Sequence, residues 1–281
     1  METTTRTSRG ILKPQLAEQH FRLTRHAPAP DLADVIDRYW VIDWDLRGQP
    51  PYEQSTISSP HINMVFDPYK TGIFGVATKR FNYLLKGQGQ VFAVKFHIGA
   101  FYPFIQSPVS EFTDSLISLG NAFGQAGETL QKQVMVANDV HSKIMLVEDF
   151  LRGHLPQPDD NVALVQQIIT EIEQDRNLMR VEDLAQRMGY SPRSLQRLFH
   201  QYVGASPKWT IRRYRLQDAA DLLDQRTPDD WARLAANLGY FDQAHFIKDF
   251  KDLIGETPAV YAASTDDASH SDADHTRSNG C

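Results

Sequence analysis

The feature that most constrains this chain is an internal repeat in its C-terminal part. Residues 184–207 contain Leu-Ala, Gly-Tyr, Leu, Phe, Gly and Ser-Pro, and residues 234–258 contain Leu-Ala, Gly-Tyr, Phe, Phe, Gly and Thr-Pro at matching positions. The offset is 50 residues up to the Gly-Tyr pair and 51 residues after it, so the extra residue lies in a turn near Phe241. Chance rarely produces so many matched positions. The sequence therefore predicts two copies of one small folding unit.

Each copy is predicted to be a helix, a tight turn and a second helix. Gly189 and Gly239 are expected to end the first helices, because glycine adopts left-handed backbone without a Cβ penalty. Ser191, with Pro192 after it, is expected to cap the second helix of the first copy. Asp242 is expected to cap the second helix of the second copy.

The second helix of each copy is predicted to have an apolar face and an exposed polar face. The apolar faces hold Leu195 and Phe199 in one copy and Phe246 and Phe250 in the other. The polar faces hold Arg193, Gln196, Arg197, Gln243, Ala244 and Lys248. Arginine and glutamine on the exposed face of such a helix are residue types that read base edges in a major groove. The repeat therefore predicts binding to double-stranded DNA.

The charge distribution supports the same prediction. The whole chain has a formal net charge of -6, whereas residues 176–215 contain nine lysines and arginines and two acids, a net charge of +7. A basic stripe on an acidic protein is typical of phosphate binding. Arg212, Arg213 and Arg215 of this stripe lie on a long helix expected between the copies, where phosphate contact and a merely solvated face are both open. The second copy is richer in acids, so we expect the first to contribute more affinity.

The N-terminal half is predicted to be β-rich. Short runs of aromatic and β-branched residues are separated by Gly and Pro, which favours a small barrel or sandwich. Apolar residues then recur at spacings of three and four, which indicates one amphipathic helix or a pair, used for dimerisation or for packing on the barrel. The expected organisation is a flexible N-terminus (1–19), a sensor domain (20–127), a helical dimerisation or packing segment (128–152), a linker (153–161), a DNA-binding domain (162–263) and a disordered tail (264–281).

Composition excludes several classes of protein. The 281 residues are 41% hydrophobic and 23% charged, as in ordinary soluble domains. We find no apolar run of membrane-spanning length and no apolar segment of a signal peptide near the start. The one cysteine, Cys281, permits no internal disulfide and no cysteine metal site. These features predict a cytoplasmic protein that does not associate with a membrane.

Residues 162–263 resemble the DNA-binding domain of the AraC/XylS transcription regulators. The resemblance is carried by Leu195-Gln196-Arg197-Leu198-Phe199, Gly204-x-Ser206-Pro207, Arg215-Leu216 to Leu222-Leu223, Gly239-Tyr240, His245-Phe246, Phe250-Lys251, Gly255 and Thr257-Pro258-x-x-Tyr261. It implies seven helices, two recognition helices in successive major-groove faces, and control of transcription initiation with RNA polymerase. The residues that it assigns to bases are Arg193, Gln196, Arg197, Gln243 and Ala244, and those assigned to phosphates are Ser191, His245 and Lys248. Arg212 of the basic stripe is a further candidate DNA contact. Ala262 departs from the arginine usual there, which puts one phosphate contact in doubt.

Residues 38–125 resemble an uncharacterised domain found before some of these regulators. The carriers are Arg38-Tyr39-Trp40, Asp45-Leu46-Arg47-Gly48, Val94-Lys95-Phe96 and Gly99-Ala100-Phe101. In the wider family this position holds a cupin-like barrel for effector binding and dimerisation, which implies a small-molecule effector and a homodimer. The candidate ligand contacts are Trp40, Trp44, Phe96 and Phe101, with core packing as the alternative.

Metal and enzymatic functions receive little support from the sequence. His61 and His97 would form a metal pair only if strands bring them together, and lone histidines without ligand spacing are usually structural. An enzyme fused to the DNA-binding domain, as in alkyl-transfer repair, would need a reactive or zinc-bound cysteine, and only Cys281 is present. We therefore expect no catalytic residue, metal or cofactor.

The predicted fold class is α+β: a small cupin-like β-barrel sensor domain with helices, followed by an all-α domain with two helix-turn-helix units. The predicted function is a sequence-specific DNA-binding transcription regulator modulated by a small molecule bound in the N-terminal domain. The alternative is a ligand-independent regulator whose N-terminal domain serves only dimerisation or partner binding.

Overall fold

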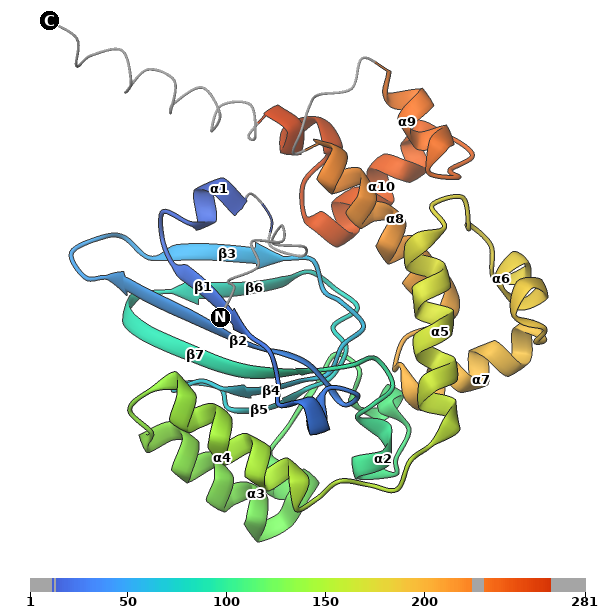
Figure 1. Cartoon of the computed structure of the whole chain (residues 1–281). Coiled ribbons are helices and arrows are strands. Elements are labelled where there is room, and N and C mark those ends of the chain that lie inside the picture. Colours follow the sequence, from blue (N-terminus) through green and yellow to red (C-terminus); the bar gives the residue numbers. More distant parts are fainter. Residues whose placement is uncertain (1–11, 13, 224–229, 264–281) are drawn as a thin grey trace, which may run out of the picture.

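The computed structural model describes residue 12 and residues 14–223 and 230–263 of the 281. A β-rich N-terminal half is followed by an all-helical C-terminal half, as Figure 1 shows. This arrangement confirms the predicted combination of a β-rich region with a helical helix-turn-helix region. The predicted disordered tail, with Cys281, and most of the predicted flexible N-terminus lie outside the described residues.

The N-terminal half contains a six-stranded sheet, in the order β1-β2-β7-β4-β5-β8, and a separate ribbon of β3 and β6. The strands are β1 (Arg22–His26), β2 (Ile36–Leu46), β3 (Tyr52–Thr56), β4 (Asn63–Phe66), β5 (Gly72–Phe74), β6 (Phe81–Leu85), β7 (Gly87–Phe96) and β8 (Leu116–Ile117). All pairings are antiparallel. Among the described residues β1 and β8 are edge strands, so the sheet is open and does not close into the expected small barrel.

Short helices connect these strands, and a helical pair follows them. The short elements are α1 (Pro14–Ala17), η1 (Pro30–Leu32), α2 (Tyr102–Ile105) and η2 (Val109–Phe112), and the pair is α3 (Leu119–Val136) and α4 (Val140–Arg152). α3 is interrupted at Gly124, whose φ of 60° is not helical. The pair covers one face of the sheet (Figure 1).

Alternation along the strands builds a different core on each face of the sheet. On one face, buried Tyr39 and Val41 of β2 pack toward α3 and α4, together with the helix residues Leu130, Val134, Val147 and Leu151. The apolar stripe of the helical segment is thus buried within the chain. On the other face, Trp40 and Trp44 face the β3–β6 ribbon in a second cluster.

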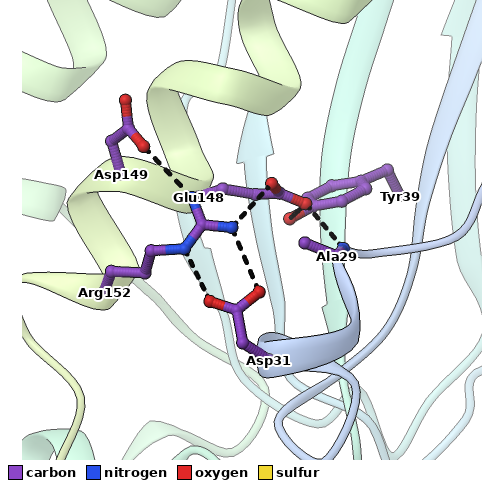
Figure 2. Close-up of polar contacts among 6 residues, drawn as sticks. All are labelled: Ala29, Asp31, Tyr39, Glu148, Asp149 and Arg152. Atoms are coloured by element: carbon purple, nitrogen blue, oxygen red, sulfur yellow. Dashed lines mark hydrogen bonds and ion pairs between the residues drawn. The ribbon is translucent and has the colours of Figure 1, made fainter.

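The buried carboxylate of Glu148 links α4 to the sheet through hydrogen bonds. Glu148 is 5% exposed; it accepts hydrogen bonds from the Ala29 backbone N–H at 2.8 Å and the Tyr39 hydroxyl at 3.3 Å. Its second oxygen pairs with Arg152 at 3.2 Å, and Arg152 also pairs with Asp31 at 2.7 Å (Figure 2). Burial and the Glu148 charge raise the pKa of the Tyr39 hydroxyl far above its usual value. The network joins α4, β2 and η1, and within it Glu148 and Tyr39 are buried while Arg152 and Asp31 reach the surface.

The C-terminal half contains α5 (Asp160–Gln174), α6 (Val181–Met188), α7 (Pro192–Tyr202), α8 (Pro207–Leu223), α9 (Trp231–Asn237) and α10 (Gln243–Ile254). A further helical segment occupies residues 258–263. α8 contributes Ile211 and Tyr214 to one core cluster with α5–α7. It contributes Leu216, Ala219 and other residues to a second cluster with α9 and α10. α8 therefore lies between the two helix-turn-helix units and packs against both of them.

The two halves are in direct contact. Arg213 Nε donates a hydrogen bond to the Ser58 carbonyl at 2.8 Å, and Trp209 Nε1 donates to the Thr78 carbonyl at 3.3 Å, both from α8. Thr113 also donates to the carbonyl of Gly204, between α7 and α8, at 2.5 Å. Within the described residues, no helix has both the length and the apolar character needed to cross a membrane.

Candidate nucleic-acid interface

The first helix-turn-helix unit is formed by α6 and α7, and its turn has the predicted caps. Gly189 ends α6 in the left-handed conformation at φ 71°. Ser191 begins α7, because its side-chain oxygen accepts a hydrogen bond from the Ser194 backbone N–H at 3.1 Å. Leu195 and Phe199 are completely buried. The opposite face of α7 therefore points to solvent, and Arg193, Gln196 and Arg197 are all exposed on it.

The second unit, formed by α9 and α10, repeats this construction with a longer turn. Gly239 has φ 74°, and Asp242 caps α10 by accepting a hydrogen bond from the His245 N–H at 2.7 Å. Two residues separate this glycine from its cap, against one in the first unit, so the extra residue lies in the turn as predicted. Phe246 and Phe250 are buried, while Gln243, Ala244 and Lys248 are exposed.

The basic stripe is only partly available to a ligand, which corrects the sequence analysis. Arg213 and Arg215 are 6% and 2% exposed and lie on neither a solvated nor a phosphate-binding face. Arg215 binds the Ile172 carbonyl and Asp218, and Arg213 binds the Ser58 carbonyl. The physical reason is that α8 is surrounded by both units and by the N-terminal half, so its arginines satisfy buried acceptors.

Three further bases of the stripe pair with acids on the surface. Arg176 lies 3.8 Å from Asp218, Arg180 lies 3.6 Å from Glu182, and Arg187 pairs with Glu171 and Asp175. By contrast, Arg193, Arg197 and Lys208 form no ion pair with any described residue and are exposed. The positive charge that can attract an anion is therefore concentrated on α7 and at the start of α8.

Two of the expected DNA contacts meet at one carboxylate. Arg212 Nε lies 3.4 Å and His245 Nε2 lies 3.6 Å from Oδ2 of Asp249, which is 5% exposed. These contacts link α8 to α10. Arg212 and His245 nevertheless keep side-chain exposures of 39% and 58%, so both still reach the surface.

Two exposed residues near these faces were not singled out from the sequence. His200 lies one helical turn beyond Gln196 and Arg197 on the exposed face of α7, where helical periodicity would have found it. Phe241 is 98% exposed in the turn directly before the cap of α10. The one-residue insertion in the repeat was the signal for Phe241, since it lengthens the turn and leaves this ring outside the core.

The four aromatic candidates of the N-terminal half divide between the two faces of the sheet. Trp40 and Trp44 line a cavity of about 290 Å³ between the six-stranded sheet and the β3–β6 ribbon. Phe96 and Phe101 lie instead in the core with α2 and α3 and pack on each other at 5.0 Å between ring centroids. The reason is strand alternation: Lys95 faces the cavity, so its neighbour Phe96 faces away from it.

The two histidines considered for a metal pair have other partners. His61 Nδ1 lies 3.0 Å from the Ser59 hydroxyl, and His97 Nε2 lies 3.1 Å from the Ala33 carbonyl. Burial, followed by the charges of Lys95 and Arg213, holds the pKa of His61 well below its ordinary value. His61 is therefore a half-buried side chain at the wall of the cavity, where its surroundings favour the neutral form.

Two family models match the chain. A model described as "Helix-turn-helix domain" matches residues 184–264, and a model described as "Domain of unknown function (DUF6597)" matches residues 24–118. The first match covers both units described above. The second covers the strands of the N-terminal half.

Curated proteins with similar sequences are named as transcription regulators. The HTH-type transcriptional activator AarP of Providencia stuartii is 33% identical over 103 residues, which cover 36% of this chain and 76% of AarP. An uncharacterised HTH-type transcriptional regulator of Haemophilus influenzae is 35% identical over 97 residues, and the regulatory protein PocR of Salmonella typhimurium is 29% identical over 121 residues. The matches cover 34% and 42% of this chain but only 32% and 38% of those two proteins.

Solved structures also match the C-terminal part. A probable AraC family transcriptional regulator from Rhodopseudomonas palustris is 30% identical, with a TM-score of 0.34, covering 37% of this chain and 97% of that one. The DNA-binding domain of AdpA, solved in complex with a target DNA, is 25% identical, with a TM-score of 0.30, covering 38% and 93%.

Proposed function

Because the chain belongs to the AraC/XylS family of transcription regulators, we propose that it binds specific double-stranded DNA sites through α7 and α10 and thereby regulates transcription initiation. The observation that carries this proposal is the exposed face of α7. There Arg193, Gln196 and Arg197 project from a helix whose opposite face is buried, and neither arginine is neutralised by a described residue. Side chains held in this way can enter a major groove.

In this proposal α7 reads the DNA bases most strongly. Arginine binds guanine O6 and N7 with two hydrogen bonds, and glutamine binds adenine N6 and N7 in the same manner. Gln243 and Ala244 of α10 read a second site, and the exposed ring of Phe241 supplies an apolar surface for a thymine methyl group. The α10 face contributes less affinity, because Asp242, Asp249 and Asp252 accompany its two exposed lysines, Lys248 and Lys251.

Phosphate contacts hold this arrangement in register. The proposed residues are Ser191 at the start of α7, Lys248 on α10, and Arg212 and His245, whose shared carboxylate Asp249 orients them without covering them. Lys208, exposed and without an ion pair to a described residue, is a further candidate.

We also propose that the N-terminal half regulates DNA binding by holding a small-molecule effector. The support is the cavity between the sheet and the ribbon, which would serve as the effector chamber although the sheet is open. The alternative is a regulator without a ligand, whose N-terminal half only dimerises or binds a partner. In that alternative the cavity has no role. RNA polymerase is the proposed protein partner, since the family acts at transcription initiation.

A homodimer is proposed with α3 and α4 as its interface. Their inner stripe is used by the sheet, but Met135, Val136 and Met145 remain exposed on the pair. Sedimentation velocity of the full chain is expected to show dimers at micromolar concentration. A monomer at all concentrations up to 100-fold higher would contradict this proposal without affecting the DNA-binding one.

The direct test is a selection of binding sites. The full chain is incubated with a random-sequence duplex library, and bound DNA is amplified over several rounds. We expect one sequence motif to be enriched, and the variant Gln196→Ala to relax it at one position. Gln88→Ala, an exposed glutamine on β7, is the matched control and should select the same motif. Recovery of unenriched DNA by the native chain would overturn the proposed function.

A further inference from the structure

The cavity between the sheet and the ribbon is cationic at one end and mainly aromatic at the other, where the buried carboxylate Asp67 accepts a hydrogen bond from the Tyr83 hydroxyl at 2.6 Å. β2 and β7 pair Arg38 with Lys95 at one end and Trp44 with Gly89 at the other, and Arg38, Lys95 and Trp44 all line the cavity. At the apolar end the Trp44 ring lies so close to Gly89 that an added Cβ would meet it at 2.2 Å. A molecule in this cavity therefore meets cations at one end, and at the other it meets aromatic rings and a carboxylate that is hydrogen-bonded to Tyr83.

Positive charge is in excess at the polar end. Arg25, Arg38 and Lys95 line the cavity there. The carboxylate that faces them, Asp37, is shared: it lies 3.0 Å from Arg38 Nε and 3.4 Å from Lys95 Nζ. Arg25 pairs with no carboxylate among the described residues. Three cations against one carboxylate leave a net charge of +2 in a partly desolvated site, which an anion would neutralise.

The pKa values reflect the same excess. Burial lowers the pKa of Lys95 to about 8, with Asp37 opposing the shift and Arg38 and Arg213 adding to it. Burial and the Arg38 charge lower the pKa of Arg25. Both side chains would gain from a negatively charged partner, since an opposite charge favours the ionised form.

The wall at the cationic end is also the surface on which α8 rests. Ile57 lines the cavity and belongs to the core cluster of α8 and α10. Ser58 lines the cavity as well, and its carbonyl accepts the hydrogen bond from Arg213 of α8. On the neighbouring segment Ala77 lines the cavity, and the carbonyl of Thr78 accepts from Trp209 of α8. A ligand that moves either segment therefore moves the helix at the centre of both DNA-binding units.

We propose that this cavity binds a small carboxylic acid anion with an apolar body, held by Arg25, Arg38 and Lys95, and that residues 57–59 and 77–78 transmit its presence to α8. This inference rests on the proposed function, because it names the effector class and the route of regulation. A volume of about 290 Å³ lies near the lower limit for small-molecule sites, which limits the ligand to a compact acid. Its apolar body lies against Trp40, Ile42 and Trp44.

The ligand class is tested with matched acids and amides. The probes are 3-phenylpropanoate, 4-methylpentanoate, octanoate and 2-naphthoate, each compared with its primary amide by tryptophan fluorescence and by thermal shift of the full chain. We expect at least one acid to quench the fluorescence and bind at least tenfold more tightly than its amide. Absence of binding by all four acids, or equal binding by acids and amides, would overturn the inference. Neither result depends on DNA binding.

The cationic residues are tested with two variants and a control. Arg25→Gln and Lys95→Met are each expected to weaken binding of that acid at least tenfold. Arg22→Gln, an exposed arginine on the same strand that does not line the cavity, should bind as the native chain does. Arg25→Gln leaves no carboxylate without a partner, so its fold is expected to be kept, as circular dichroism would verify. Native affinity in Arg25→Gln would contradict the assignment.

The route to α8 is tested with DNA. Bound acid is expected to change the affinity of the native chain for its selected DNA site at least threefold. Trp209→Phe, which removes the indole donor to the Thr78 carbonyl and keeps an aromatic ring, and Arg213→Leu should still bind the acid but lose most of this change. If the native chain binds both acid and DNA without coupling, the route is wrong while the proposed function stands. If the chain binds no DNA, the proposed function fails, and the acid and amide comparison still decides the ligand class.

Discussion

At the scale of single residues, the structure separates the arginines that support the fold from those available to DNA. Arg213 and Arg215 satisfy carbonyl oxygens inside the chain, whereas Arg193 and Arg197 point to solvent from α7. A buried arginine removed from its acceptors destabilises the fold, while an exposed one is free to bind phosphate or bases. Substitutions on α7 should therefore change DNA binding and leave stability almost unchanged.

Arg197 provides the first prediction. Arg197→Ala is expected to cost about 1–3 kcal/mol of specific binding free energy and to relax base preference at one position of the site. The measurement is fluorescence anisotropy with the selected DNA and single-base variants of it. An equal loss on all sequences would instead make Arg197 a phosphate contact.

His61 provides a prediction on pH. Its pKa is lowered in the folded chain by burial and by the charges of Lys95, Arg213, Arg38 and His97, so the unfolded chain binds the proton more readily. Protonation of His61 therefore costs no free energy of unfolding above the ordinary histidine pKa of about 6.5. As the pH falls below this value, the free energy of unfolding declines. In His61→Gln, the free energy of unfolding, measured with urea, should fall less between pH 7.5 and pH 5 than it does in the native chain.

The control for this prediction is His141→Gln, an exposed histidine on α4. It should retain the native pH dependence. The explanation fails if His61→Gln and the native chain lose the same free energy of unfolding between these two pH values.

At the scale of elements, each helix depends on particular polar groups at its ends and on its buried face. Ser191 begins α7 and is also a proposed phosphate contact, and the two roles respond differently to substitution. Ser191→Ala is expected to cost about 1 kcal/mol of stability through the lost cap. Ser191→Asp should keep the cap but weaken DNA binding by repelling phosphate. Native DNA affinity in Ser191→Asp, measured by anisotropy, would place Ser191 away from the DNA backbone.

Glu148 is the polar group that holds α4 against the sheet. Glu148→Ala leaves the Ala29 N–H and the Tyr39 hydroxyl without their acceptor, so we expect a loss of about 2–4 kcal/mol in the free energy of unfolding. Asp149→Ala removes an exposed partner of the same Arg152 and should cost about 0–1 kcal/mol. Urea unfolding measures both. Equal effects would show that the burial of Glu148 does not matter.

The sequence predicted these elements best where the signals are local. The caps at Ser191 and Asp242, the left-handed glycines and the longer second turn depend on a few neighbouring residues, and the structure has them. The sequence could not show that Arg213 is buried, because its acceptor, the Ser58 carbonyl, is 155 residues away. Nor could it separate Trp40 from Phe96, since alternation tells which residues share a face but not which face borders a cavity.

At the scale of the whole molecule, an acidic chain presents a small basic face. The net charge is -6, yet α7 and the start of α8 carry bases without ion pairs to the described residues. DNA binding should therefore be confined to this face, and its affinity should fall as salt increases, because each phosphate contact releases counterions from the DNA. α8 joins both DNA-binding units to the N-terminal half, so the same helix is available for regulation.

The most direct test of sequence-specific DNA binding is an anisotropy titration of the full chain at several salt concentrations. The DNA is a duplex from the region upstream of its own gene or the selected site, with a scrambled duplex of equal composition as the control. We predict tighter binding to the specific duplex, with an affinity that falls steeply as salt increases. Failure to bind either duplex at low salt would contradict the account and leave α5–α10 as a packing module.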